Sequence, residues 1–178
     1  MSPGWKKLLE SMHNLWTTLD TTSARKPVGF TSLKAYLRRS NYTLEHAIIS
    51  SRASFDSTKL QYVTEKCKQL KILDMRGTGI LSGSLDAALP HARRLENLKT
   101  GSNMRMSMAT ASRAIEAARN TIVTASFLDV VATNSPNSGA PFRHTAKRLK
   151  DLEIRCNSGG IIMDLVRRFL PSFGSWLF

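Results

Sequence analysis

The sequence has few of the residues from which catalytic and metal centres are usually built. Its two cysteines, Cys67 and Cys156, form neither a CxxC pair nor a disulfide framework, and its four histidines are widely separated. No histidine has a cysteine or carboxylate at metal-ligand spacing, and there is no GxSxG nucleophile elbow or complete phosphate-binding loop. We therefore predict no catalytic residue, no metal and no cofactor, and we expect a protein that is not an enzyme.

Aromatic residues and long apolar runs are also scarce. Aromatics make up 7% of the 178 residues, which favours a core of aliphatic side chains. The first residues lack the pattern of a secretory signal, and no apolar stretch is long enough to span a bilayer. Together with the absence of a disulfide framework, this predicts a protein of the nucleus or cytoplasm that has no membrane partner.

Positive charge is what the sequence has in excess. It contains 26 Lys and Arg against 13 Asp and Glu, which gives a formal net charge of +13. Such an excess promotes association with acidic partners and non-specific binding of nucleic acid. The basic residues are scattered without a long run, so a generally basic surface also explains the composition.

A short apolar triplet recurs five times along the chain. Each copy has the form apolar-x-x-apolar-x-apolar, and the first positions lie 26, 25, 27 and 27 residues apart. A period of about 20–29 residues is typical of leucine-rich repeats, in which each unit adds one strand and one helix to a stack. We therefore predict an α/β fold, a leucine-rich-repeat solenoid with parallel strands on a concave face and helices on a convex face. The five triplets are Leu44/Ala47/Ile49, Leu70/Leu73/Met75, Leu95/Leu98/Thr100, Ile122/Ala125/Phe127 and Leu149/Leu152/Ile154.

Apolar residues at helical spacing lie between the triplets. Asp56 and Ser84 are predicted N-caps, and Pro90 is expected to shorten or kink its helix. Neither a strand nor a helix buries its apolar side alone, so neighbouring units are expected to bury it for one another. The residues predicted to face the sheet are Phe30, Leu33 and Leu37; Phe55, Leu60, Val63 and Cys67; Leu85, Leu89 and Ala92; and Ala111, Ala114, Ile115 and Ala118.

The two ends of the chain follow the pattern less closely. Residues 5–12 predict an amphipathic helix, and residues 14–19 predict a short strand that opens the array, since they precede the first triplet by about one period. Residues 133–143, rich in Pro, Gly, Ser and Asn, predict a loop. From Ile161 onward we expect a short amphipathic helix and an exposed end, with a helix on a membrane surface as the alternative.

The opening segment resembles the second half of an F-box. In that family a helix with a W-x-x-L-like start runs into a turn and a Leu-Trp pair, and then into the first repeat strand. With the triplets that follow, residues 4–157 are similar to fungal proteins that combine an F-box with leucine-rich repeats, of the type with tetratricopeptide repeats before the F-box. The first half of the F-box is not in the sequence, so we expect an N-terminally truncated member of this group. The residues that match are Trp5, Leu8, Leu15, Trp16 and Leu19.

The resemblance implies a function. An F-box engages the Skp1 adaptor of a cullin-RING ubiquitin ligase of the SCF type, and the repeats hold the protein substrate. It also implies three regions, namely the C-terminal part of an F-box at 1–20, the repeats at 21–157 and an atypical tail at 158–178. The resemblance implies that the residues facing the adaptor are Trp5, Leu8, Leu9, Leu15 and Trp16.

Side chains that alternate with the triplets are expected on the opposite face of the strands, where a partner would bind. They carry both signs of charge with a slight excess of cations. The candidates for contact with a protein substrate are Lys71, Asp74, Arg76, Lys99 and Arg155. The alternative is a basic, repeat-like module that associates with nucleic acid or chromatin and loses affinity steeply with salt.

Overall fold

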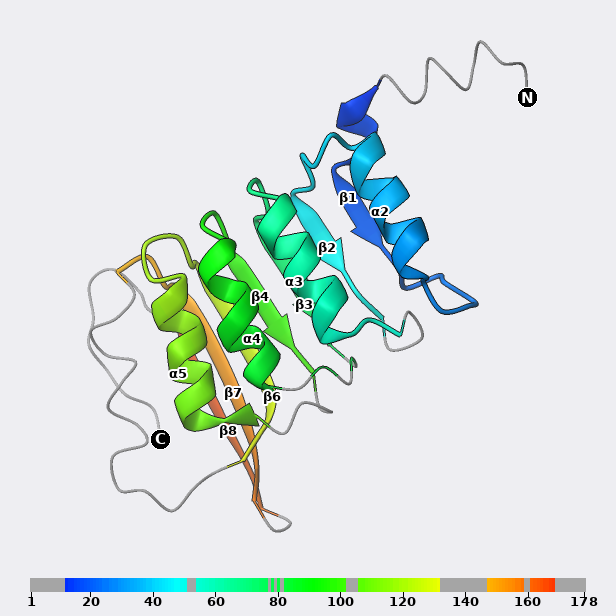
Figure 1. Ribbon diagram of the computed structural model, residues 1–178. Coiled ribbons are helices and arrows are strands. Elements are labelled where there is room, and N and C mark those ends of the chain that lie inside the picture. The colour runs from blue at the N-terminus through cyan, green and yellow to red at the C-terminus, as the bar shows by residue number, and fades with distance from the viewer. Residues whose placement is uncertain are drawn as a thin grey trace.

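The computed structural model describes residues 12–50, 54–76, 78, 80, 82–101, 106–131, 147–158 and 161–168 (Figure 1). They form one sheet with the helices on one of its sides. The helices are α2 (Phe30–Arg39), α3 (Ser57–Lys66), α4 (Ser82–Ala88) and α5 (Met108–Ala117), with the 3-10 helices η1 (His13–Trp16) and η3 (Leu89–His91). The strands are β1 (Thr18–Asp20), β2 (His46–Ile48), β3 (Ile72–Met75), β4 (Asn97–Thr100), β5 (Met106–Ser107), β6 (Thr124–Val131), β7 (Asp151–Ser158) and β8 (Ile161–Arg168).

The order of strands in the sheet follows the order in the chain. The path runs β1-β2-β3-β4-β6-β7-β8, and short β5 pairs with the far end of β6. All neighbours are parallel except β7 and β8, which are antiparallel. Parallel neighbours need a crossover connection, and helices α2 to α5 supply most of these crossovers. The predicted α/β class with parallel strands is therefore confirmed.

The five apolar triplets occupy matching places in the sheet. Their middle residues pair in one continuous row, Ala47 with Leu73, then Leu98, Ala125 and Leu152. All members of all five triplets are buried, including Thr100, whose hydroxyl donates to the carbonyl of Ser126 at 3.5 Å. The period of the sequence therefore gives the register, and the predicted core is confirmed.

The main chain before the strands repeats one hydrogen-bond arrangement. The carbonyl of Glu45 accepts from the amides of Lys71 (2.8 Å) and Ile72 (3.0 Å), and that of Lys71 accepts from Glu96 (2.8 Å) and Asn97 (2.9 Å). Since each carbonyl accepts from two amides of the next unit, consecutive units are held together at the point where their strands begin. The carbonyls of Thr17, Glu96 and Val123 make the same double contact.

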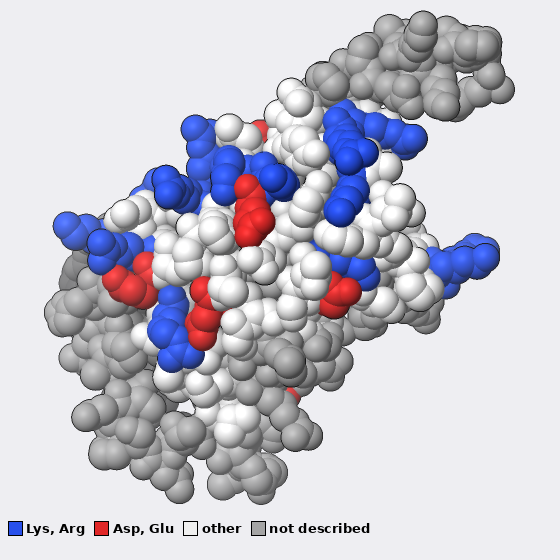
Figure 2. Space-filling model, in the orientation of Figure 1, with Lys and Arg blue, Asp and Glu red and all other residues white. Residues whose placement is uncertain are grey.

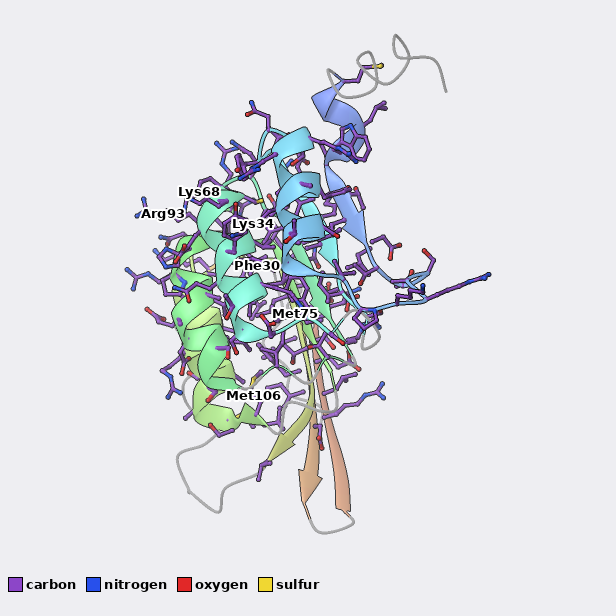
Figure 3. The ribbon with its side chains drawn as sticks, turned by 45° about the vertical axis from the view of Figure 1, so that its right-hand side comes forward. Phe30, Lys34, Lys68, Met75, Arg93 and Met106 are labelled. Carbon is purple, nitrogen blue, oxygen red and sulfur yellow. The ribbon has the colours of Figure 1, made fainter. Side chains whose placement is uncertain are left out.

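The helices pack on the sheet through the residues that the sequence predicted. All of these side chains are buried except Phe30, which is partly buried and packs edge-on against Tyr62 with 5.3 Å between ring centres. Lys34 lies over the Phe30 ring at 4.2 Å (Figure 3). A small buried residue ends each helical segment, which lets the chain turn back to the sheet. These residues are Ser40, Cys67, Ala92 and Ala118.

Two of the three predicted helix-boundary residues, Asp56 and Pro90, act as expected, and the third, Ser84, does not. Asp56 is the N-cap of α3, because its side chain accepts from the amide of Lys59 at 2.9 Å. Ser84 is not a cap, because α4 already begins at Ser82 and Ser84 lies inside it. Pro90 shortens the helix as expected, since α4 ends at Ala88 and continues only as the 3-10 turn η3.

The predicted strand at residues 14–19 is wrong in its first half. His13–Trp16 forms the 3-10 helix η1, and the strand begins only at Thr18. Leu19 nevertheless pairs with Ala47, so the inferred alignment with the first triplet is confirmed. Trp16 leaves the strand path because its ring packs edge-on against Tyr36 of α2, with 5.5 Å between ring centres.

The helix predicted from Ile161 is also wrong, because residues 161–168 form β8 along the free edge of β7. The β-branched residues of this segment favour a strand, and Gly159-Gly160 is typical of a two-residue hairpin connection. The predicted helix at 5–12, apart from Met12, and the predicted loop at 133–143 lie outside the described residues. Strand β1 precedes the expected boundary at residue 20 and β8 follows that at 157, and both belong to the same sheet.

Candidate functional site

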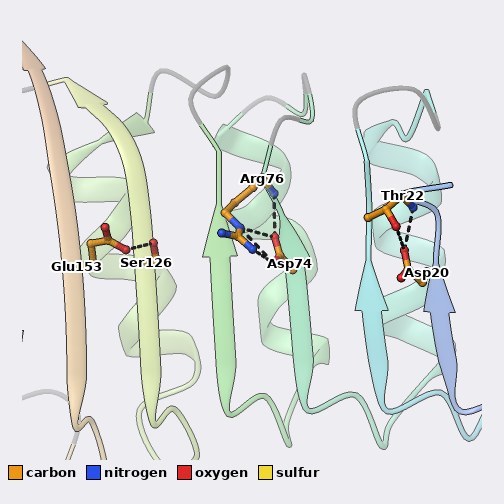
Figure 4. A network of polar contacts seen from close by, with 6 residues as sticks. All are labelled: Asp20, Thr22, Asp74, Arg76, Ser126 and Glu153. Carbon is orange, nitrogen blue, oxygen red and sulfur yellow. Dashed lines mark hydrogen bonds and ion pairs between the residues drawn. The ribbon is translucent and has the colours of Figure 1, made fainter. Parts of the chain in front are cut away.

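The side of the sheet opposite the helices presents two rows of side chains, which we call the strand face. Figure 4 looks onto this face, with the helices behind the strands. Because alternate residues of a strand point to opposite sides, these rows come from the positions between the triplet residues. The first row is Thr18, His46, Ile72, Asn97, Thr124 and Asp151, and the second is Asp20, Ile48, Asp74, Lys99, Ser126 and Glu153.

Asp74 and Arg76 form the best-defined ion pair of the strand face. The Nη2 of Arg76 lies 2.7 Å from Oδ2 of Asp74, and its Nε lies 3.0 Å from Oδ1, so the guanidinium binds both oxygens (Figure 4). The Asp74 side chain is 11% exposed and that of Arg76 53%. Burial opposes ionisation of Asp74, but the hydrogen bonds and charge of Arg76 together hold its pKa below the usual value. The carboxylate is therefore charged and fixed in position.

Glu153 of β7 organises a second group with Ser126 of the neighbouring strand β6. Its Oε2 accepts from the hydroxyl of Ser126 at 2.7 Å, and its Oε1 accepts from Nε of Arg155 at 3.0 Å. The pKa of Arg76 is raised mainly by Asp74, and the charge of Glu153 adds to this, so the two groups act on one another across β4 and β6. Lys99 stands between them on β4 and adds to the lowering of the Asp74 pKa.

Four of the five predicted contact residues therefore come together. Asp74, Arg76, Lys99 and Arg155 lie on the strand face or at its end. Lys71 instead precedes β3, where its ammonium group lies 2.9 Å from Oε2 of Glu45. The arginines of this face and Lys71 are each paired with a carboxylate, so these predicted cations do not stand alone.

The sequence reasoning missed the polar residues at the end of β1. Both the amide and the hydroxyl of Thr22 donate to Oδ1 of Asp20, at 2.8 and 2.7 Å, and they lower the pKa of this carboxyl in that order (Figure 4). Thr21 and Ser50 link the ends of β1 and β2, since the hydroxyl of Ser50 donates to the carbonyl of Thr21 at 2.7 Å. Asp20 lies two periods of the apolar triplets before Asp74 in the sequence. This spacing is the signal that could have predicted Asp20 as a strand-face residue.

The residues expected to face an adaptor are only partly described. Trp5, Leu8 and Leu9 lie outside the described residues. Leu15 is 54% exposed, whereas Trp16 is half-buried between Tyr36 and the guanidinium of Arg39, which lies 5.7 Å from the centre of its ring. The two residues, both expected to contact the adaptor, therefore have different roles. Trp16 fixes η1 to α2, whereas Leu15 points to solvent.

Other kinds of site find no support in the described part of the chain. No three His, Cys, Asp or Glu side chains within it come together in a way that would hold a metal ion. None of its helices combines the length and apolar character needed to span a bilayer. Comparison with protein-family models, with curated proteins and with solved structures finds no match to this chain.

Proposed function

We propose that this chain is a leucine-rich-repeat solenoid that recognises the protein substrate of an SCF-type ubiquitin ligase and is not itself catalytic. The observation that carries the repeat assignment is the register of the triplets. Their middle residues pair in one row on parallel strands that follow the chain order, with the helices on one side. A stack of this kind offers an extended surface in place of an enclosed cleft, so we place the partner on the strand face.

The chemistry of the strand face suits a protein partner. Its charges are held by ion pairs on strands, so a partner meets a fixed pattern of both signs, which favours specificity. Six parallel strands at a spacing of about 4.8 Å give a face about 24 Å wide. This width approaches the diameter of a small domain, about 30 Å.

The adaptor role rests on the F-box resemblance and on the exposure of the opening segment. Met12 and Leu15 are two of the three large apolar side chains that are exposed in the described part of the chain, at 39% and 54%. Both lie within or next to η1, which Trp16 anchors to α2. Exposed apolar residues beside an anchored aromatic are what an adaptor contact needs.

Binding of a purified Skp1-type adaptor tests the adaptor role. We expect the full chain to bind, and Leu15→Asp to weaken binding at least tenfold. Val131→Asp is the matched control, because Val131 is 40% exposed at the end of β6, far along the chain from η1. No binding by the full chain, or an equal loss in both variants, would contradict the assignment.

Exchange of an ion pair tests the substrate role. Asp74→Arg/Arg76→Asp reverses the pair of the strand face, whereas Asp86→Arg/Arg113→Asp reverses a pair of 2.8 Å on the helix side. Both exchanges keep the net charge. We expect only the first to reduce the ubiquitination of proteins that depend on this chain, measured by quantitative ubiquitin-remnant proteomics. If the second exchange has the same effect, the strand face is not the recognition surface.

A further inference from the structure

Basic residues that are scattered in the sequence gather along one edge of the structure. Figure 2 shows Lys and Arg side chains concentrated at the end of the molecule where the helices stop and the strands begin. All of these side chains are exposed. We call this surface the basic edge, and its described members are Arg38, Arg39, Lys66, Lys68, Arg93, Arg94, Arg119, Lys147 and Arg148.

The register of the sheet explains why they line up. The groups from Arg38 to Arg119 sit in the last turn of a helix or in the turn that leads from it into the next strand, and Lys147-Arg148 lie in the turn before β7. Each unit therefore places its basic residues at the same end of the strands. Lys147-Arg148 precede Leu149 just as Arg93-Arg94 precede Leu95. Figure 3 shows Lys68 and Arg93 extending outward from two consecutive units.

Contacts between units confirm that the groups are neighbours. The guanidinium of Arg94 donates to the side-chain carbonyl of Gln69, which belongs to the preceding turn. The charges of Arg38 at the end of α2 and Lys66 at the end of α3 both help to lower the pKa of Tyr42, although the main cause is a hydrogen bond with Tyr62. The first three groups are therefore neighbours, and the register of β4, β6 and β7 places Arg119 and Lys147-Arg148 in line with them.

Helix stabilisation explains only part of this surface. Cations in the last turn of a helix interact favourably with its dipole, which accounts for Arg38, Arg39 and Lys66. Arg93, Lys147 and Arg148 lie outside the α-helices, so the dipole does not account for them.

The basic edge is also poorly neutralised, in contrast to the strand face. Among its described members other than Arg39, only Arg119 has an ion pair with a carboxylate, at 2.8 Å from Glu116. On the strand face both Arg76 and Arg155 bind carboxylates. A row of positive charges with few carboxylate partners repels itself, and an anionic partner relieves this repulsion.

We propose that the basic edge binds the phosphate backbone of a nucleic-acid duplex without reading its base sequence. The cations recur from one unit to the next. Neighbouring strands lie about 5 Å apart and neighbouring helices about 10 Å apart, so the cations form a regular row along the edge. Such a row suits a linear polyanion. The ring of Trp16, below Arg39, packs on Tyr36 instead of standing free to stack on an unpaired base.

The test is fluorescence anisotropy of the full chain with a labelled 24-base-pair duplex of random sequence, over a range of KCl concentrations. For contact with about five phosphates, the logarithm of the association constant falls against the logarithm of the salt concentration with a slope of about −4.5. We expect Lys68→Glu/Arg93→Glu to weaken binding at least tenfold and to reduce this slope by about two.

Arg25→Glu/Lys26→Glu is the matched control. It makes the same change in net charge at two exposed residues of the loop after β1. This loop follows the end of its strand, whereas the basic edge lies where the strands begin. We expect less than a twofold loss of affinity. Circular dichroism of both variants verifies that they remain folded.

Three results would overturn the proposal. Equal loss in both variants would mean that only the bulk charge matters. Tighter binding to a single strand of the same sequence, or binding to phosphatidylserine vesicles without binding to the duplex, would assign the surface to another partner. Since the strand face and Leu15 are left intact in both variants, none of these results bears on the ligase proposal.

Discussion

Replacement of Leu98 by alanine tests the register of the sheet most directly. Leu98 is fully buried on β4, between Leu73 of β3 and Ala125 of β6. The change removes the equivalent of about three methylene groups, at about 0.8 kcal/mol each in transfer free energy. The cavity adds a further penalty, and because the neighbour Ala125 is small, little side chain is available to fill it. We expect the free energy of unfolding to fall by about 3–4 kcal/mol.

Lys99→Ala is the matched control, one residue further along the same strand. Its side chain points to the strand face and is only partly buried, so we expect a loss below about 0.5 kcal/mol. Urea unfolding followed by far-UV circular dichroism measures both variants, and equal m-values would show that the same surface is exposed in each.

A shift of the register by one residue would reverse these two outcomes. Side chains alternate along a strand, so a register shifted by one residue would turn Leu98 toward the strand face and Lys99 into the core. Equal losses of stability in the two variants, or a larger loss for Lys99→Ala, would refute the assigned register and with it the strand face.

Three further predictions follow from single side chains. Asp56→Ala removes the N-cap of α3 and should lower the free energy of unfolding by about 1 kcal/mol in urea titrations, whereas Asp56→Asn should retain most of it; equal losses would argue against the cap. Burial raises the pKa of Cys67 to about 12, so in a Cys156→Ser background we expect its labelling by a thiol-reactive disulfide to be slow in the native protein and fast in denaturant, and rapid native labelling would contradict this burial. Arg76 holds the pKa of Asp74 below its usual value, although burial opposes ionisation of this carboxyl. The stability that the ion pair contributes is present above the unfolded pKa of about 3.9, and it is lost as the pH falls from there through the lowered pKa of the folded state. The difference in stability between the wild type and Arg76→Gln should therefore shrink from pH 7 to pH 3 in urea titrations, and a difference independent of pH would exclude the pairing as its cause.

The core could be predicted from the sequence, whereas much of the candidate site could not. Leu73 and Leu98 were assigned to one buried row because an apolar pattern with a fixed period leaves one choice for the side that faces the helices. The same alternation gave Asp74 and Lys99 as strand-face residues. It gave no partners, since pairing such as that of Ser126 with Glu153 depends on two segments 27 residues apart in the chain.

Errors in the prediction fell at the ends of the array, where the periodic signal is weakest. A short apolar segment is compatible with either a helix or a strand until its neighbours are known. Residues 161–168 form a strand because β7 offers them a free edge. Trp16 leaves the strand path because α2 offers a place for its ring beside Tyr36.

By itself, the sequence determined which side chains are buried, because burial of apolar surface depends on a pattern that is local and repeated. Only the tertiary structure decided where the charges lie. Stacking units in register brings Lys68, Arg93 and Arg148 to one edge and leaves Arg76 beside Asp74 on the strand face. Electrostatic interactions depend on distance in space, and a list of scattered charges contains no such distances.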